Sequence, residues 1–510
     1  MIWLLMAACT DKPVDDSAPV TDTDADTDAD ADTDTDTDTD TTGEADSLER
    51  ADVRITGAPS DAAGNSVAAA GDVNLDGYAD IIVSAYYGNR ACVFEGPIAA
   101  GDYALSAGAT CFTGEGRYDF LGYDAEGAGD VTGDGVPDVL LGAIGNADFG
   151  TNAGKVYLVA GPLAAGEVAV AGSQTSWTGE ASGDYLGVAV RHVGDVTGDG
   201  APDIALGASG NDGSGAGGGK LYIWSGPFDT PGATFAAADT PIQVEGQPLP
   251  TSAPPPHGSY GGGDAVGDAV AGPGDVNGDG VDDLLVGAPG NATNGSSSGM
   301  AALFFGPLPD AATSVSDGDY LIFGTVEAAY LASPLDAAGD TDDDGLKDYF
   351  VSSDGEDAGV VYLITGSNRT GEASAPDAAA TRFLGDVTGD QAGFGLAGGG
   401  DVNGDGVPDV LIGAPSHDRP APGCGEGETV SERYDAGITY VVAGPFAPGV
   451  IDLSTSPSWG GACAGDNAGR SLAFAGDVNG DGADDALFGA IYNDDGGAFA
   501  GKAYLFYDSD

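Results

Sequence analysis

The sequence predicts an all-β protein, a seven-bladed β-propeller built from four-stranded antiparallel blades. A nine-residue acidic pattern occurs seven times, and each copy stands directly before a short apolar run with strand character. The copies recur at intervals of 58 to 80 residues. Each interval is long enough for one four-stranded blade, and seven units fall within the usual range of about four to eight blades.

The acidic pattern itself indicates a cation-binding loop. Hard cations such as Ca²⁺ take about six to eight oxygen ligands, and alternate positions of a tight loop can supply them. Here positions 1, 3, 5 and 9 carry side-chain oxygens, position 7 can offer its carbonyl, and the glycine at position 6 permits a sharp turn. The sequence therefore predicts up to seven Ca²⁺ sites. Their expected ligands are Asp72, Asn74, Asp76, Tyr78 and Asp80; Asp130, Thr132, Asp134, Val136 and Asp138; Asp195, Thr197, Asp199, Ala201 and Asp203; Asp275, Asn277, Asp279, Val281 and Asp283; Asp340, Asp342, Asp344, Leu346 and Asp348; Asp401, Asn403, Asp405, Val407 and Asp409; and Asp477, Asn479, Asp481, Ala483 and Asp485.

An EF-hand is the main alternative for such a loop. It requires a bidentate Glu at position 12 and flanking helices, whereas position 12 of the first copy is Val83, within a run of apolar residues. The copies also differ among themselves. Thr132 and Thr197 are weaker ligands than Asp or Asn, while Asp342 adds a carboxylate to the fifth copy. On charge count the fifth site should bind most tightly, and the second and third least.

The flanks are as regular as the loops. Before each loop comes a stretch such as FLGYDAEGAGD, and after it a strand that most often closes in Gly-Ala, such as VLLGAIG; a third element such as GKVYLVAGP follows. These residues resemble the FG-GAP repeat of integrin alpha-chain N-terminal β-propellers and their bacterial relatives. The resemblance covers the chain from about Asp52 to the C-terminus. The fifth repeat departs most, because SPLDAAGD and YFVSSDG lack the Gly-Ala signature.

Ring closure is a test of the seven-bladed interpretation. The chain ends after GKAYLFYD, which is the third strand of the last block, so that block lacks a fourth strand. The segment VRITG, which begins at Val53, precedes the first block. We therefore expect residues 53–57 to pair with residues 503–507 and to complete the last blade.

Blade topology sorts the loops onto two faces. All seven cation loops join first and second strands, so they share one face. The two largest insertions, residues 246–264 and 416–435, fall on the opposite face as a blade-to-blade loop and a second-to-third loop. Long loops on a rigid scaffold often carry binding, so the opposite face is the candidate ligand surface. The alternative is that both are tolerated insertions without a partner.

The N-terminus predicts the location of the protein. Residues 1–9 form a short apolar run ending in Cys9, which resembles a bacterial lipoprotein signal with Cys9 as the lipidated residue; a chance apolar start is the alternative, because no basic residue precedes the run. Residues 10–50 are dominated by Thr-Asp and Ala-Asp pairs and are expected to be a disordered linker. Residues 51–510 are assigned to the propeller. We expect an extracytoplasmic protein that is either lipid-anchored at the cell surface or outer membrane, or secreted.

The remaining four cysteines suggest two disulfides. Cys92 and Cys111 fall on the third and fourth strands of the first blade, and Cys424 and Cys463 both belong to the sixth. An even number of cysteines in an exported protein favours pairing, and proximity favours Cys92 with Cys111 and Cys424 with Cys463.

The composition narrows the function. A formal net charge of −67 argues against nucleic acid or anionic lipid as a partner. His192, His257 and His417 lack metal-ligand spacing, and no common catalytic motif is present, so no catalytic residue is expected. The favoured function is a cell-surface, Ca²⁺-stabilised adhesion module that binds a protein or glycan. The alternatives are a secreted hydrolase or lyase on a propeller scaffold and a passive surface-coat protein.

Overall fold

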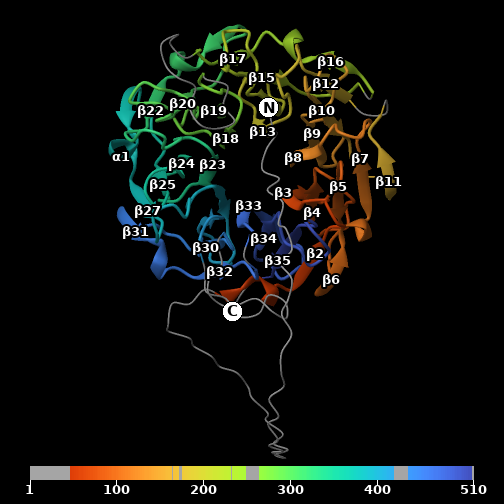
Figure 1. Ribbon diagram of the computed structural model, residues 1–510. Helices are drawn as coiled ribbons and strands as arrows, with labels where there is room; N and C mark the ends of the chain where they lie inside the picture. The colour runs from red at the N-terminus through yellow and green to blue at the C-terminus, as the bar shows by residue number, and fades with distance from the viewer. Residues whose placement is uncertain are drawn as a thin grey trace, which may run out of the picture. The chain divides into compact units, whose positions relative to one another are not determined.

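The computed structural model describes residues 46–507, apart from residues 164, 172–174, 231, 249–262, 419–434 and 464. Cys9, His257 and Cys424, and most of the two long insertions, lie outside these residues. The compact unit is Gly43–Asp510. Its strands form seven sheets arranged in a ring (Figure 1). The predicted all-β, seven-bladed propeller is therefore confirmed.

Each blade contains four antiparallel strands, which are numbered here from the innermost strand of the ring to the outer ones. The innermost strands of blades 1 to 7 are β3 (Ala63–Gly71), β8 (Leu121–Gly129), β13 (Val190–Gly194), β18 (Val270–Gly274), β23 (Leu335–Gly339), β28 (Gly395–Gly400) and β33 (Ala468–Gly476). The second strands are β4 (Asp80–Ala85), β9 (Asp138–Ala143), β14 (Asp203–Ala208), β19 (Asp283–Ala288), β24 (Asp348–Ser353), β29 (Asp409–Ala414) and β34 (Asp485–Ala490). The third strands are β5 (Arg90–Phe94), β10 (Lys155–Val159), β15 (Lys220–Ser225), β20 (Met300–Phe304), β25 (Val360–Ile364), β30 (Ile438–Val442) and β35 (Lys502–Phe506). The fourth strands are β7 (Thr110–Thr113), β12 (Thr175–Thr178), β17 (Gln243–Glu245), β22 (Tyr320–Phe323), β27 (Thr381–Leu384), β32 (Ser458–Gly460) and β2 (Val53–Thr56).

The second strands are buried along their whole length, which explains their near-continuous apolar sequences. Apolar side chains of adjacent blades pack together in shared clusters, such as the one that joins Ile81 of blade 1 to Leu487 of blade 7. The recurrent glycine of the Gly-Ala signature permits this close packing. A Cβ atom at Gly142 would lie 2.2 Å from the carbonyl oxygen of Gly187 in the next blade. In the divergent blade 5 a serine takes this place, and the Oγ of Ser352 donates a hydrogen bond to the carbonyl of Gly393 at 2.6 Å.

A fifth, parallel strand on the outer edge of every blade was not predicted. In six blades it comes from the connection between the third and fourth strands of the next blade around the ring, and in blade 6 it comes from the N-terminal segment that precedes β2. We call these seven segments the straps. Their strands are β6 (Gly101–Ala104) on blade 7, β11 (Gly166–Ala169) on blade 1, β16 (Thr234–Ala236) on blade 2, β21 (Ala312–Ser314) on blade 3, β26 (Gly371–Ser374) on blade 4, β31 (Gly449–Asp452) on blade 5 and β1 (Asp46–Ser47) on blade 6.

A short helical turn follows the strand in six of the straps. These turns are η1 (Leu48–Arg50), η2 (Leu105–Ala107), η3 (Ala237–Asp239), η4 (Val315–Asp317), η5 (Leu453–Thr455) and the α-helix α1 (Ala375–Ala378). Each strap inserts one apolar side chain that is at most 2% exposed: Leu48, Leu105, Val170, Ala237, Val315, Ala375 and Leu453. The straps therefore fasten each blade to its neighbour.

The ring closes between the two ends of the described chain. β2 pairs antiparallel with β35, with Val53 opposite Leu505 and Ile55 opposite Ala503. The sequence predicts this pairing. The N-terminal segment does more than was predicted, because β1 pairs in parallel with β32 and Leu48 is fully buried. The boundary at residue 50 was therefore wrong. Residues 46–50 were assigned to the linker, but they form the seventh strap.

Candidate functional site

The seven acidic loops have one shared hydrogen-bond pattern. In every loop the two carboxylate oxygens of position 1 accept the backbone N–H groups of positions 5 and 6; in the first loop both distances from Asp72 are 2.9 Å. The position 5 carboxylate likewise accepts the N–H of position 7. Each loop is thus folded around its own carboxylates. Because a carboxylate oxygen has more than one lone pair, these contacts leave acceptor capacity for a cation.

The position 9 aspartates are fully buried at the start of the second strands. One oxygen of Asp80 accepts the N–H of Val73 at 2.9 Å, and the other accepts the N–H of Gly96 at 2.7 Å. Gly96 follows the third strand, and its equivalents in four other blades make the same contact. The recurrent glycine after the third strand therefore holds the loop, a role that sequence reasoning missed.

Burial raises the pKa of most position 9 carboxyls. Desolvation raises the pKa of Asp80, Asp203 and Asp283 to about 6, and that of Asp485 to about 7. Nearby loop carboxylates add to the shift; for Asp485 these are Asp481 and Asp477. Each of these loops therefore places several negative charges around a desolvated carboxylate, and a divalent cation would neutralise them.

The fifth loop brings three carboxylates closest together. One oxygen from each of Asp340, Asp342 and Asp348 lies within 4.8 Å of the others. Among the described residues, these three side chains have ligand atoms close enough together to hold a metal ion jointly. The pKa of Asp342 is raised, first by desolvation and then by the charges of Asp348 and Asp344. This donor set fits a hard divalent cation such as Ca²⁺.

The second and third loops use position 3 differently. Thr132 donates its hydroxyl to the position 9 carboxylate of its own loop at 3.4 Å, and Thr197 does the same at 3.5 Å. In the loops with Asn at position 3, the side-chain amide oxygen of that Asn instead accepts the backbone N–H of position 5. The threonines bring no additional charge, so the predicted order of affinities stays a prediction.

Hydrogen bonds join several pairs of neighbouring loops. The N–H of Ala79 in loop 1 donates to the carbonyl of Asp477 in loop 7 at 3.1 Å, and the equivalent bonds join loops 5 and 4 and loops 7 and 6. The carboxylate of Asp484, at position 8 of loop 7, also accepts the N–H of Asp401 in loop 6. Perturbing one loop should therefore be felt by its neighbours.

The opposite face carries an aromatic cluster, which consists of Tyr86, Tyr87, Tyr118, Phe120 and Tyr123. The first two come from the β4–β5 loop, Tyr118 and Phe120 from the β7–β8 loop, and Tyr123 from the start of β8. The rings of Tyr86 and Tyr87 stack at 4.2 Å, and Tyr86 lies 5.6 Å from Tyr123. Both loops are on the side away from the cation loops. Sequence reasoning missed this cluster, although the adjacent tyrosines at 86 and 87 are a visible signal.

The large aromatic side chains that are exposed to solvent also lie on this face. Tyr87 is 50% exposed, Tyr118 65%, Phe149 59% and Phe499 57%. These are the four large aromatic side chains among the exposed apolar residues of the described chain, and all four lie in loops of the aromatic face. Phe499 belongs to blade 7 and Phe149 to blade 2, so the exposed aromatics gather over blades 7, 1 and 2. Exposed aromatic surface of this kind is typical of recognition sites.

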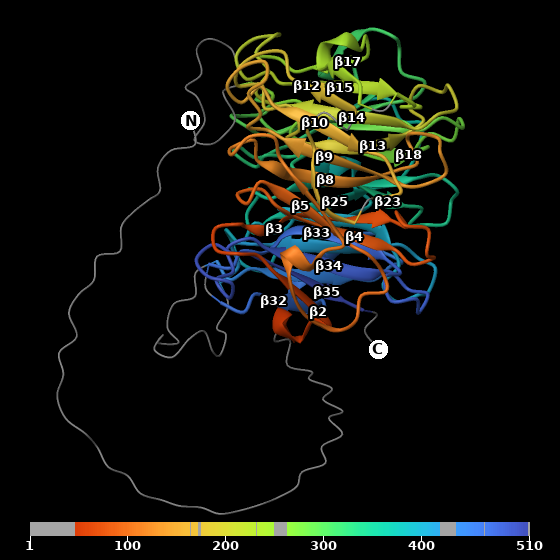
Figure 2. The ribbon, with the colours of Figure 1, turned by 90° about the vertical axis from the view of Figure 1, so that its right-hand side faces the viewer.

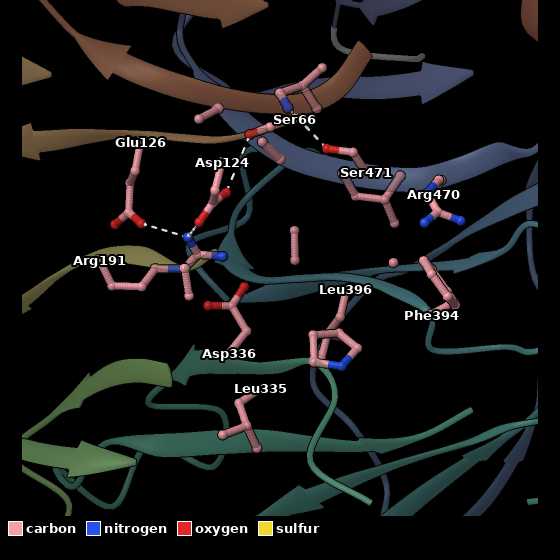
Figure 3. Close-up of a pocket in the computed structure, with 18 of the residues that line it drawn as sticks. Ser66, Asp124, Glu126, Arg191, Leu335, Asp336, Phe394, Leu396, Arg470 and Ser471 are labelled. Carbon is pink, nitrogen blue, oxygen red and sulfur yellow. Dashed lines mark hydrogen bonds and ion pairs between the residues drawn. The ribbon is translucent and has the colours of Figure 1, made fainter. Parts of the chain in front are cut away.

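A cavity of about 790 Å³ lies at the centre of the ring, lined by innermost strands and by the residues just before them. On one side of it, Arg191 pairs with Asp124 at 2.5 Å and with Glu126 at 3.2 Å, near Asp336 (Figure 3). Desolvation raises the pKa of Glu126 to about 8 and that of Asp336 to about 6. Sequence reasoning missed this cluster, because its members come from blades 2, 3 and 5.

The other predicted residues have the following positions. Cys92 and Cys111 are opposite each other on β5 and β7 and form the expected disulfide. Cys463 is also disulfide-bonded, and its expected partner Cys424 lies outside the described residues. His417 contacts the carboxylate of Asp390 through Nδ1 at 2.6 Å, while burial lowers the pKa of His192.

The fold and the loops together define a β-propeller with repeated cation-type loops. The family model described as FG-GAP repeat matches residues 63–103, 266–304 and 392–442, which lie in blades 1, 4 and 6. The chain is a β-propeller with FG-GAP repeats in these three blades, and it is similar to integrin alpha chains.

Two curated relatives support that likeness. Integrin alpha pat-2 of Caenorhabditis briggsae is 30% identical over 244 residues, which cover 45% of this chain and 18% of the relative. Integrin alpha-PS2 of Drosophila melanogaster is 35% identical over 121 residues, which cover 24% of this chain and 8% of the relative. The chain thus spans less than a fifth of the length of either relative.

Proposed function

We propose that this propeller is an extracytoplasmic adhesion module that binds a protein or glycan through its aromatic face, while Ca²⁺ in the seven loops stabilises the ring. The exposed aromatic surface over blades 7, 1 and 2 is the observation that carries the proposal. Aromatic side chains supply large contact area at low entropic cost, and they are enriched where proteins bind partners.

Calcium is assigned a structural role because of how the loops are built. The carboxylates of each loop already organise its backbone, and several adjacent loops are hydrogen-bonded to one another. A cation at ten times its dissociation constant stabilises a protein by about 1.4 kcal/mol per site. Seven such sites would contribute on the order of 10 kcal/mol, which is comparable to the stability of a whole domain.

An extracytoplasmic location is supported by the disulfides. Cys92–Cys111 and the bonded Cys463 are typical of an oxidising compartment. Among the described residues, no helix has both the length and the apolar character needed to cross a membrane. Lipidation of Cys9, with anchorage at the cell surface or outer membrane, remains part of the proposal, and a secreted form is its alternative. The strongly acidic chain disfavours nucleic acid as a partner.

A non-catalytic role fits the partners of the side chains that could act as acids or bases. Asp124 and Glu126 are engaged by Arg191, and His417 is engaged by Asp390. The convergence of Asp124, Glu126 and Asp336 on one cavity is the observation that would favour a hydrolase or lyase instead. A passive surface-coat role is the third possibility, and it predicts no specific ligand.

The test uses the purified chain in Ca²⁺ against an array of glycans and purified extracellular proteins. The Tyr87→Ala/Tyr118→Ala variant should lose the signals of the unmodified chain. Leu75→Ala, which changes an equally exposed side chain in a cation loop, should keep them. Specific binding that survives in the tyrosine variant would contradict the assignment of the face, and the absence of any binding would favour the coat role.

A further inference from the structure

The central cavity contains two arginines with very different surroundings. Arg191 contacts the carboxylates of Asp124 and Glu126 and the carbonyl of Val190, the last at 2.7 Å, all through Nη1. Arg470 stands on the other side, with its guanidinium carbon 4.6 Å from the centre of the Phe394 ring (Figure 3). Within the described chain, Arg470 has neither a hydrogen bond nor an ion pair.

Among the described residues, Arg470 lacks a carboxylate partner, unlike Arg191, the other arginine that lines the cavity. The chain has 82 acidic and 15 basic residues, so carboxylates are abundant. Stacking on an aromatic ring fixes the plane of a guanidinium but satisfies none of its N–H donors. A planar guanidinium with free donors inside a cavity can bind a carboxylate through two parallel hydrogen bonds.

Across the cavity, Asp336 offers the complementary charge. Its carboxylate accepts the N–H groups of Ala337 and Gly398 at 2.9 and 3.0 Å, and it has no ion pair with Arg191 within 4.0 Å. The two backbone bonds fix its orientation and leave lone pairs for a further donor. Leu335, Leu396 and Phe394 add apolar surface to the lining of the cavity.

We infer that the central cavity binds a small zwitterionic ligand of the size of a short peptide. The ligand's carboxylate would pair with Arg470, and its ammonium group would pair with Asp336. The cavity volume of about 790 Å³ falls in the range of roughly 300–1,000 Å³ that is typical of small-molecule sites. A zwitterion also fits the net charge, because a simple anion would be repelled by this acidic protein. Tyr123 of the aromatic cluster also lines this cavity, whereas the four exposed aromatic side chains do not.

Trialanine is a suitable probe, and calorimetry of the full chain in Ca²⁺ is the measurement. Unmodified trialanine should bind. N-acetyl-trialanine, which lacks the ammonium group, and trialanine amide, which lacks the carboxylate, should each bind about tenfold to a hundredfold more weakly, since each loses one charge-assisted contact.

The variants assign each end of the ligand to one residue. Arg470→Gln should weaken trialanine and abolish its advantage over trialanine amide, while Asp336→Asn should abolish its advantage over N-acetyl-trialanine. Arg117→Gln is the matched control, because Arg117 also stacks on an aromatic ring, that of Tyr118 at 5.4 Å, but does not line the cavity. It should bind as the unmodified chain does.

Circular dichroism and the melting midpoint show whether each variant is folded. Arg470→Lys is a milder change, because lysine keeps the positive charge but lacks the planar guanidinium that can form two parallel hydrogen bonds. It should bind trialanine more weakly than the unmodified chain and more tightly than Arg470→Gln. The inference is overturned if trialanine fails to bind at millimolar concentration, if capping either end has no effect, or if folded Arg470→Gln binds like the Arg117→Gln control.

Discussion

The two faces of the propeller differ in how far their seven units resemble one another. On the loop face, the position 1 and 5 carboxylates of all seven loops accept the same hydrogen bonds, and several neighbouring loops are hydrogen-bonded to each other. On the aromatic face, exposed rings gather over blades 7, 1 and 2, which are neighbours in the ring (Figures 1 and 2). Uniformity is what a shared structural requirement produces, whereas a single distinctive sector is what a binding site requires. The difference therefore separates stabilisation from recognition.

Removal of Ca²⁺ should have the largest effect on stability. With a chelator, the free energy of unfolding should fall by on the order of 10 kcal/mol, as the loop carboxylates lose their counter-charge. Calorimetric melts with and without chelator measure this change. The two midpoints should differ by about ten degrees, or the metal-free ring should fail to melt cooperatively. Coincident melts would contradict the structural role of the loop face.

Truncating the buried strap residue Leu48 should be the next largest effect. Leu48→Ala creates a cavity where the N-terminal segment docks, and it should cost about 2–5 kcal/mol. Val450→Ala is the control, because Val450 lies in the strap strand β31 but is 52% exposed. Urea denaturation gives both values. Equal losses in the two variants would mean that the strap does not hold the ring through its buried side chain.

Acidification should stabilise the metal-free protein. Burial raises the pKa of Asp354 to about 7, above its ordinary value near 3.8. The folded state therefore binds more protons between these values, and stability is lost as pH rises through that window. In chelator, the melting midpoint should rise as the pH is lowered from 7.5 to 5. Asp354→Asn should remove about 1–3 kcal/mol of the accompanying gain in stability. A midpoint that falls over this range would contradict the argument.

The fifth and second loops offer a smaller test within one face. Asp342→Asn should weaken the fifth site, and Thr132→Asp should strengthen the second, each shifting stability by about 1 kcal/mol at limiting Ca²⁺. Melting midpoints across a Ca²⁺ titration separate the two, and in saturating chelator the shifts attributable to the cation should vanish. Shifts in the reverse order would show that charge count does not set affinity here.

Much of the fold could be predicted from sequence because the repeat is dense. The seven acidic loops recur at intervals of about one blade and so identify the blades. The alternation of loop and apolar strand then locates the first three strands of each blade. The disulfide between Cys92 and Cys111 followed from their places on adjacent strands. Such local patterns are strong because each blade must satisfy them separately.

The rest depends on contacts between distant parts of the chain. The straps share only one buried apolar side chain each, so segments such as the one containing Leu48 carry little signal beside an acidic linker. The pairing of Arg191 with Asp124 joins two blades across 67 residues, and the isolation of Arg470 is visible only once the cavity is formed. Sequence patterns report neither kind of contact.

The division between the two faces is tested most directly by measuring melting and ligand binding on the same two variants. For any glycan or protein captured on the array, Tyr87→Ala/Tyr118→Ala should abolish binding. Its stability in Ca²⁺, judged from the melting midpoint, should change by no more than a surface substitution usually causes, about 0.5 kcal/mol. Asp342→Asn should lower the midpoint at limiting Ca²⁺ and leave affinity unchanged at a temperature where it is folded. The opposite result, in which folded Asp342→Asn loses the ligand and the tyrosine variant keeps it, would place recognition on the loop face and contradict the account.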